Sequence, residues 1–239
     1  MLSNQRSVYK RARYSQFGLQ LWLDGTAIDN IIRDGSNKIS KVEDRTSYLR
    51  HFEQTTAANQ PLFVPSGINS LPAIRFDGVS SFLNFSDPTL SWLNNTSFTI
   101  FYVATKTAQA SNSFVIGGSA SGTRTNLSSG YLNANTYRIG FGGDDLPTIV
   151  PVRPAGTPEL YCIKFSTADN SRIVRRNKSI VGIGASNGAL SGMTGQALGR
   201  HLGAFGQFDL GELIIYNRVL SDYETEQVER DLMSKWTIS

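Results

Sequence analysis

The sequence contains a single cysteine, Cys162, among 239 residues. One cysteine cannot form an intramolecular disulfide, so the fold must be stabilised by burial of apolar surface. Cys162 lies within the apolar run Glu159–Phe165, which predicts a small buried side chain in a strand. Histidine is also scarce, with His51 and His201 alone, so the three or four close His or Cys ligands of a zinc site are lacking.

Long apolar runs are absent as well. No stretch reaches the roughly 18 apolar residues of a membrane-spanning helix, and the mean hydropathy is −0.21. Residues 1–13 lack the apolar core of a secretory signal. We therefore expect no membrane partner, and synthesis in the cytoplasm without export by that route.

The excess of basic charge is small, with a formal net charge of +4 and a pI of about 9.2. Part of it lies in the first residues, where cations alternate with aromatic side chains: Arg6, Tyr9, Lys10, Arg11, Arg13 and Tyr14. We expect residues 1–18 to form a basic arm, which either docks on a neighbouring subunit or is disordered. Residues 19–239 are expected to form one domain. The arm does not resemble a nucleic-acid platform, so no nucleic-acid partner is expected.

Apolar, β-branched and aromatic runs recur along the chain between turn residues, a pattern typical of a β-sandwich. The expected strands are 19–23, 73–76, 81–85, 97–104, 113–116, 136–141, 159–165, 172–174, 179–183 and 208–216. Residues 97–104 are apolar on both faces and predict a central strand. A hairpin is expected to turn at Asn177-Lys178, and its cations (Arg172, Arg175, Arg176 and Lys178) are expected in solvent. The Gly/Ser/Asn-rich segments 117–130 and 184–206, the latter with His201, are expected to be loops.

The last thirty residues predict a strand followed by a helix. Leu213–Tyr216 suits a buried strand. Ser221 and Glu224 have the spacing of a helix-capping box. Beyond them Thr225, Val228, Leu232 and Trp236 fall on one stripe of the helix. Such a helix needs an apolar surface to pack on, and the preceding strands supply it.

Two motifs resemble the laminin-G-like branch of the concanavalin A-like lectin/glucanase superfamily. One is Tyr216–Ser221 with the helix that ends in Lys235-Trp236, and the other is Ala73–Leu83, which contains Phe-Asp-Gly. The resemblance implies an antiparallel jelly-roll β-sandwich with a C-terminal α-helix. It also implies that Glu212 is a buried acceptor and that Asp77 binds backbone amides in a turn.

The superfamily includes retaining glucanases, which use two carboxyl groups about 5–5.5 Å apart. Family enzymes carry them on one strand as Glu-x-Asp-x-Glu, and this triplet is absent here. Asp209 and Glu212 come nearest, and their spacing predicts opposite faces of a regular strand. We therefore expect no catalytic residues and no enzyme.

A glycan site needs an exposed aromatic ring and nearby polar groups. Tyr131 and Tyr137 are the candidate rings, and Arg138 and Asp144 the candidate polar groups; core packing is the alternative for the rings. Asp144 and Asp145 are also weak candidates for calcium, although the sequence Gly-Gly-Asp-Asp suits a turn better. Otherwise no metal or cofactor is expected.

The resemblance, the basic arm and the lack of a secretory signal lead us to expect a non-catalytic bacteriophage virion surface protein. It would be a head decoration protein, a fibre protein or a tail component. Its partners would be other virion proteins or copies of itself, and cell-surface glycans. The alternative is a soluble carbohydrate-binding lectin module of a bacterial protein. A third reading is a structural cement protein without a glycan ligand.

Overall fold

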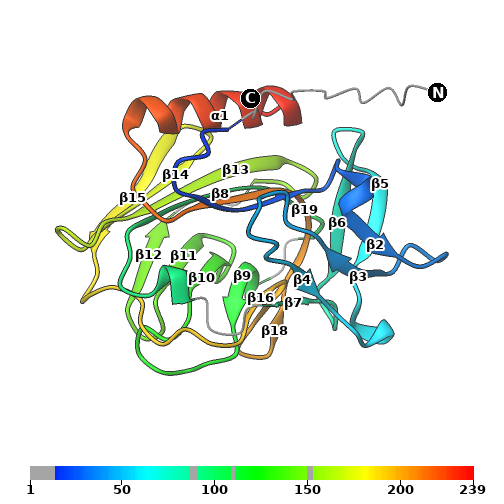
Figure 1. Cartoon of the computed structure of the whole chain (residues 1–239), viewed down its shortest axis with the longest axis horizontal. Coiled ribbons are helices and arrows are strands. Elements are labelled where there is room, and N and C mark those ends of the chain that lie inside the picture. Colours follow the sequence, from blue (N-terminus) through cyan, green and yellow to red (C-terminus); the bar gives the residue numbers. More distant parts are fainter. Residues whose placement is uncertain (1–13, 87–90, 109–110, 150–152) are drawn as a thin grey trace, which may run out of the picture.

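The structure is a computed structural model that describes residues 14–86, 91–108, 111–149 and 153–239. Two large antiparallel sheets face one another, and a long helix lies on the outer face of one sheet (Figure 1). This architecture confirms the expected all-β sandwich with a C-terminal helix. No helix in the described ranges combines the length and apolar character needed to cross a membrane.

The sheet that carries the helix is called sheet A. Its strands are β1 (Leu19–Asp24), β5 (Leu62–Ile68), β6 (Leu71–Asp77), β8 (Phe98–Lys106), β13 (Pro158–Phe165), β14 (Ser171–Arg176), β15 (Ser179–Ala185) and β19 (Gln207–Tyr216). Their order is β15-β14-β13-β8-β19-β6-β5. Strand β1 pairs with residues 212–216 of β19, beyond the part of β19 that pairs with β6.

The facing sheet is called sheet B. Its strands are β2 (Ile31–Arg33), β3 (Ile39–Val42), β4 (Phe52–Glu53), β7 (Leu83–Phe85), β9 (Ser113–Gly118), β10 (Ser128–Tyr131), β11 (Thr136–Gly140), β12 (Asp145–Ile149) and β16 (Gln196–Leu198). They run in the order β12-β11-β10-β9-β16-β7-β4-β3-β2. A small hairpin of β17 (Arg200–His201) and β18 (Ala204–Phe205) packs beside β9. Short 3-10 turns occupy Ile28–Asn30, Ala57–Asn59 and Ser91–Leu93.

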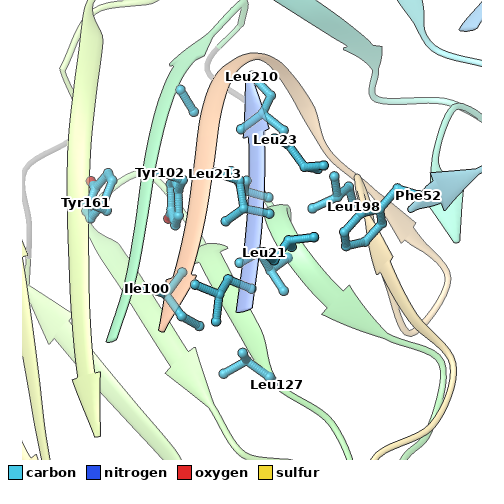
Figure 2. Close-up of a cluster of buried hydrophobic side chains, with 14 of the residues drawn as sticks. Leu21, Leu23, Phe52, Ile100, Tyr102, Leu127, Tyr161, Leu198, Leu210 and Leu213 are labelled. Carbon is cyan, nitrogen blue, oxygen red and sulfur yellow. The ribbon is translucent and has the colours of Figure 1, made fainter. Parts of the chain in front are cut away.

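The main hydrophobic core fills the space between the two sheets (Figure 2). Leu21, Ile100 and Leu213 enter it from sheet A, while Phe52 and Leu198 enter it from sheet B. Strand β8 is buried along its whole length, because its alternate residues face this core and the helix. The expectation of a central strand covered on both faces is confirmed.

A second core lies between the outer face of sheet A and helix α1 (Asp222–Trp236). The buried helix residues include Thr225, Val228, Leu232 and Trp236, which is the predicted stripe. At the start of the helix Ser221 Oγ accepts a hydrogen bond from the Glu224 amide. In turn, the Glu224 carboxylate accepts a hydrogen bond from the Ser221 amide at 3.0 Å. The capping box is therefore confirmed.

The expected strands are all present, and so is the hairpin at Asn177-Lys178, where both residues adopt positive φ. The two expected long loops are partly wrong. They contain the start of β10 and all of β16, β17 and β18. These strands are only two to four residues long, so they are too short to show an alternating pattern. His201 lies in β17 and is buried, not in a loop.

The basic arm, expected to span residues 1–18, ends before Tyr14. Tyr14 packs in the second core, and its hydroxyl donates to Glu212 Oε1 at 3.1 Å. Nearby, Arg218 donates to the Phe17 carbonyl at 2.9 Å. Residues 14–18 thus belong to the folded domain, because their removal would uncover the core beneath the helix. The other predicted arm residues, Arg6, Tyr9, Lys10, Arg11 and Arg13, lie outside the described residues.

Candidate functional site

The two tyrosines expected to stack on a sugar lie inside the protein. Tyr131 is 5% exposed and Tyr137 is 0% exposed, because both point from sheet B into the main core. The Tyr137 ring stacks on Tyr161 with 4.3 Å between centroids. Neither ring is open to a ligand, which corrects the expected aromatic platform and supports the alternative of core packing.

Instead, these tyrosines belong to a buried polar network. Tyr131 donates to Glu159 Oε2 at 2.9 Å, and Glu159 pairs with Arg176 at 3.2 Å. The ammonium group of Lys106 lies 3.8 Å from the centroid of the Tyr131 ring. Burial is the main cause that raises the pKa of Glu159. Because each polar group has a partner, the network orders this end of the core.

Asp144, expected to bind a glycan or calcium, is held inside the fold. It pairs with Arg172 at 3.1 Å and accepts from the Ser186 hydroxyl at 2.6 Å and the Asn187 amide at 2.7 Å. Asp145 pairs with Arg138 at 3.0 Å. Since arginines occupy both carboxylates, the pair is not set up to bind calcium. Across the described part of the chain, no group of three His, Cys, Asp or Glu side chains could hold a metal ion.

Arg138 lies on the opposite face of β11 from Tyr137 and Ile139. Its Nη2 is 2.9 Å from His201 Nε2, and its guanidinium covers the Phe114 ring. Burial, followed by the charge of Arg138, lowers the pKa of His201 to about 4. The neutral imidazole can therefore accept a hydrogen bond from the Arg138 guanidinium through Nε2. The sheet separates Arg138 from Tyr131 and Tyr137, so the four predicted residues do not form one site.

The carboxylates of β19 share a face, contrary to the expectation from their spacing. A bulge at Gly211 shifts the register, so that Asp209 pairs with Thr105 and Glu212 with Val103. Both therefore point to the outer face of sheet A. Separate partners hold the two carboxylates: Arg75 pairs with Asp209 and Lys235 pairs with Glu212.

Glu212 is a buried acceptor, as expected. It accepts hydrogen bonds from four side chains: Tyr14 at 3.1 Å, Trp22 at 2.8 Å, Lys235 at 2.7 Å and Trp236 at 2.9 Å. These residues come from the first strand, the segment before it and the end of the helix. We call this group the Glu212 cluster. Asp77 likewise accepts from the amides of residues 79, 80 and 81, as expected, and these bonds lower its pKa against the effect of burial.

Beyond the Glu212 cluster, the outer face of sheet A is hollowed into a polar cleft of about 580 Å³. It is lined by Gly67, Arg75, Thr105, Thr107, Ala155, Gly156, Gln207 and Asp209. We call it the Arg75–Asp209 cleft. Strands β5, β6, β8 and β19 supply its floor.

A bidentate ion pair forms one side of the cleft. Arg75 Nε and Nη2 donate to the two oxygens of Asp209 at 2.7 and 2.8 Å. Hydrogen bonding to Asp209 is the main cause that raises the pKa of Arg75. The Asp209 side chain is buried, whereas that of Arg75 is 42% exposed. The pair thus fixes the Arg75 guanidinium at the wall of the cleft, with its exposed part open to a ligand.

Thr105 supplies an unsatisfied hydroxyl to the same cleft. The residue is 4% exposed, and its Oγ1 has no hydrogen-bond partner among the described residues. A buried hydroxyl without a partner is costly. Because Thr105 Oγ1 is closed to solvent in this structure, a ligand hydroxyl would reach it only after the side chain rotates. Close packing explains the glycine nearby: a Cβ at Gly67 would lie 2.6 Å from the Cβ of Ala73.

Sequence reasoning did not identify this cleft. Arg75 and Asp209 are 134 residues apart, and only the pairing of β6 with β19 brings them together. The one sequence feature that could have indicated this ion pair is Asp209 itself, because a carboxylate inside an apolar strand requires a partner. The bulge that turns Asp209 to the outer face is not visible in the sequence.

Comparison with known proteins shows the fold of this chain. No protein-family model and no curated protein matches it. Among solved structures it is similar to the sialidase of Trypanosoma rangeli in complex with 2,3-difluorosialic acid, with a TM-score of 0.63 and 17% identity. That match covers 93% of this chain and 34% of the sialidase, so the chain spans about a third of that enzyme's length.

Two further structures are similar over most of this chain. Domain 4 of AbnA, a GH43 extracellular arabinanase from Geobacillus stearothermophilus in complex with arabinotriose, matches with a TM-score of 0.61 and 14% identity, covering 87% of this chain and 97% of the domain. The binding domain of Paraclostridial Mosquitocidal Protein 1 matches with a TM-score of 0.63 and 13% identity, covering 90% and 52%. At these identities the likeness shows a shared β-sandwich fold.

Proposed function

We propose that this protein is a non-catalytic glycan-binding module and that the Arg75–Asp209 cleft is its ligand site. The observation that carries the proposal is the buried, unsatisfied Thr105 hydroxyl in a polar cleft beside a fixed ion pair. Sugar hydroxyls both donate and accept, so they can accept from the exposed guanidinium of Arg75 and, once its side chain rotates, donate to the Thr105 hydroxyl. Domain 4 of AbnA, which has a similar fold, was solved with arabinotriose, and this supports a saccharide as the ligand.

Binding without hydrolysis follows from the state of the carboxylates. A retaining glycosidase needs one carboxyl group as nucleophile and a second as acid/base. Here Asp209 is neutralised by Arg75, and Glu212 is fully enclosed by its four donors. Neither can act as a free nucleophile, although both lie on one face. Glycan recognition is the function that this geometry supports.

A glycan array with the full chain tests the proposal. We expect saturable binding to a defined set of oligosaccharides, and Thr105→Val should weaken it about tenfold through the loss of one hydrogen bond. Thr55→Val removes an exposed threonine from another part of the surface and is the matched control. Absence of binding, or equal binding by the Thr105→Val variant, would contradict the proposed site. Hydrolysis of an arrayed glycan would contradict the non-catalytic assignment.

We further propose that the module is displayed on a bacteriophage virion and that the basic arm attaches it to other virion proteins. The sequence resemblance and the basic composition of residues 1–13, which also contain Tyr9, support this role. Because Tyr14 belongs to the core, the informative deletion is residues 1–13. The shortened protein should fold and bind glycan normally but fail to join its assembly. Normal incorporation would favour the alternative of a soluble lectin module.

A further inference from the structure

Strand β15 forms one edge of sheet A. It pairs with β14 on one side, and among the described residues no strand hydrogen-bonds to its other side, although β12 of sheet B packs against it through Leu146, next to Gly184. Its sequence, Ser-Ile-Val-Gly-Ile-Gly-Ala, contains no charged residue and no proline. Edge strands of soluble proteins are normally protected by charges, proline or a covering segment, because their unpaired backbone groups can pair with another chain. A bulge at Val181 twists β15 but adds no charge.

Two large apolar side chains of β15 are exposed. Ile180 is 54% exposed and Ile183 is 66% exposed. Ile183 lies opposite Ile173 and Ile180 lies opposite Arg175, which reaches Glu229 of the helix. Both isoleucines thus point to the outer face, beside α1. An apolar patch that adjoins an open strand edge is suited to pairing with another strand.

The cations near this edge do not protect it, because they are neutralised within the chain. Arg172 pairs with Asp144, Arg175 with Glu229 and Arg176 with Glu159. This corrects the expectation that the hairpin cations are all in solvent. Of that group only Lys178, at the hairpin turn, is exposed. A second chain could therefore approach β15 without meeting unpaired charges along its length.

We propose that β15 pairs antiparallel with β15 of a second copy of this chain, which joins the two A sheets across a two-fold axis. Antiparallel pairing of a strand with its own copy is self-complementary. The ends of the hairpin carry opposite charges, since Lys178 stands at one end of β15 and exposed Asp169 precedes β14 at the other. Two-fold pairing brings Lys178 of each copy to the Asp169 end of the other. The association does not depend on a ligand in the Arg75–Asp209 cleft.

Sedimentation of the full chain from about 1 to about 100 µM tests this pairing, because this range resolves micromolar association. We expect a dimer of twice 26.2 kDa. Ile183→Lys should weaken dimerisation at least about tenfold, since it places a charge in the apolar patch. Val79→Lys, which changes an exposed apolar residue outside this edge, should leave dimerisation unchanged.

Charge reversal gives a second test that does not depend on the apolar patch. Lys178→Asp and Asp169→Lys should each weaken the dimer, and the double variant should restore it. Hydrogen exchange should show β15 amides that become protected as concentration rises. A wild-type monomer at all concentrations, or a dimer that Ile183→Lys leaves intact, would overturn the proposal.

Discussion

Glu212 shows how one buried residue can connect distant parts of the chain. Its carboxylate receives hydrogen bonds from Tyr14, Trp22, Lys235 and Trp236, so it ties the start of the domain to the end of the helix. Lys235 also pairs with Asp24 at 2.6 Å, which extends the network to the end of β1. A buried charge is tolerated here because every acceptor position has a donor.

Replacement of Glu212 by alanine should lower the free energy of unfolding by about 3 kcal/mol, because it leaves two indole N–H groups without their acceptor and Lys235 with Asp24 alone. Glu226→Ala, on the exposed side of the same helix, is the control and should change it little. Urea unfolding of both variants measures the difference. Similar stabilities for the two variants would contradict the structural role of Glu212.

His201 should act as a neutral residue over most of the pH range. Its folded-state pKa of about 4 lies below the ordinary value of 6.5, so the unfolded chain binds the proton more readily. The resulting contribution to stability is fully present above pH 6.5 and is lost as the pH falls from 6.5 towards 4. Titration of the His201 ring by NMR should give a midpoint near 4, and a midpoint near 6.5 would refute the buried arrangement.

At the residue scale, the sequence predicted the structural roles of single residues better than it predicted which residues line a ligand site. Glu212 and Asp77 act as expected, because the family motifs define their surroundings. Tyr131 and Tyr137 were misplaced, since an alternating strand has two faces and the sequence does not reveal which one the partner sheet covers. The Arg75–Asp209 pair depends on strand pairing over a long sequence distance, which local patterns do not encode.

At the element scale, the bulge in β19 decides which side chains reach the outer face. Gly211 interrupts the register between Leu210 and Glu212, so Asp209 and Glu212 face the same way. The bulge residue also lies against the helix: a Cβ at this position would be 2.8 Å from the Trp236 ring. Glycine thus permits both the bulge and the close approach of α1.

Gly211→Ala should therefore destabilise the protein by about 1–3 kcal/mol, because the added methyl group forces Trp236 or β19 to move. Gly35→Ala is the matched control, since a Cβ there would have no atom within 4 Å. Thermal unfolding should show a lower Tm for Gly211→Ala and little change for Gly35→Ala. An unchanged Tm for Gly211→Ala would mean that the helix does not pack on the bulge.

The longest elements carry the clearest periodic patterns. Strands β8 and β19 and helix α1 each carry an apolar pattern over eight or more residues, and their burial follows it. Strands β4, β16, β17 and β18 have only two or three residues each. They form because neighbouring strands supply hydrogen-bond partners, so their presence depends on tertiary structure.

At the scale of the whole molecule, the outer face of sheet A has three regions. Helix α1 covers one region and closes the second core. The Arg75–Asp209 cleft lies beyond the Glu212 cluster, and the β15 edge lies at the far side of the sheet. The proposed ligand site and the proposed self-association surface are therefore separate, so two linked copies could bind one multivalent glycan with increased avidity.

The central claim is that the Arg75–Asp209 cleft binds a glycan. The most direct measurement is an NMR titration of the full chain with the glycan that binds best on the array. The account predicts that the amides of Gly67, Thr105, Gly156 and Asp209 shift, and that Thr105→Val weakens the titration about tenfold. Shifts confined to sheet B around Arg138, or no shift with any arrayed glycan, would contradict it.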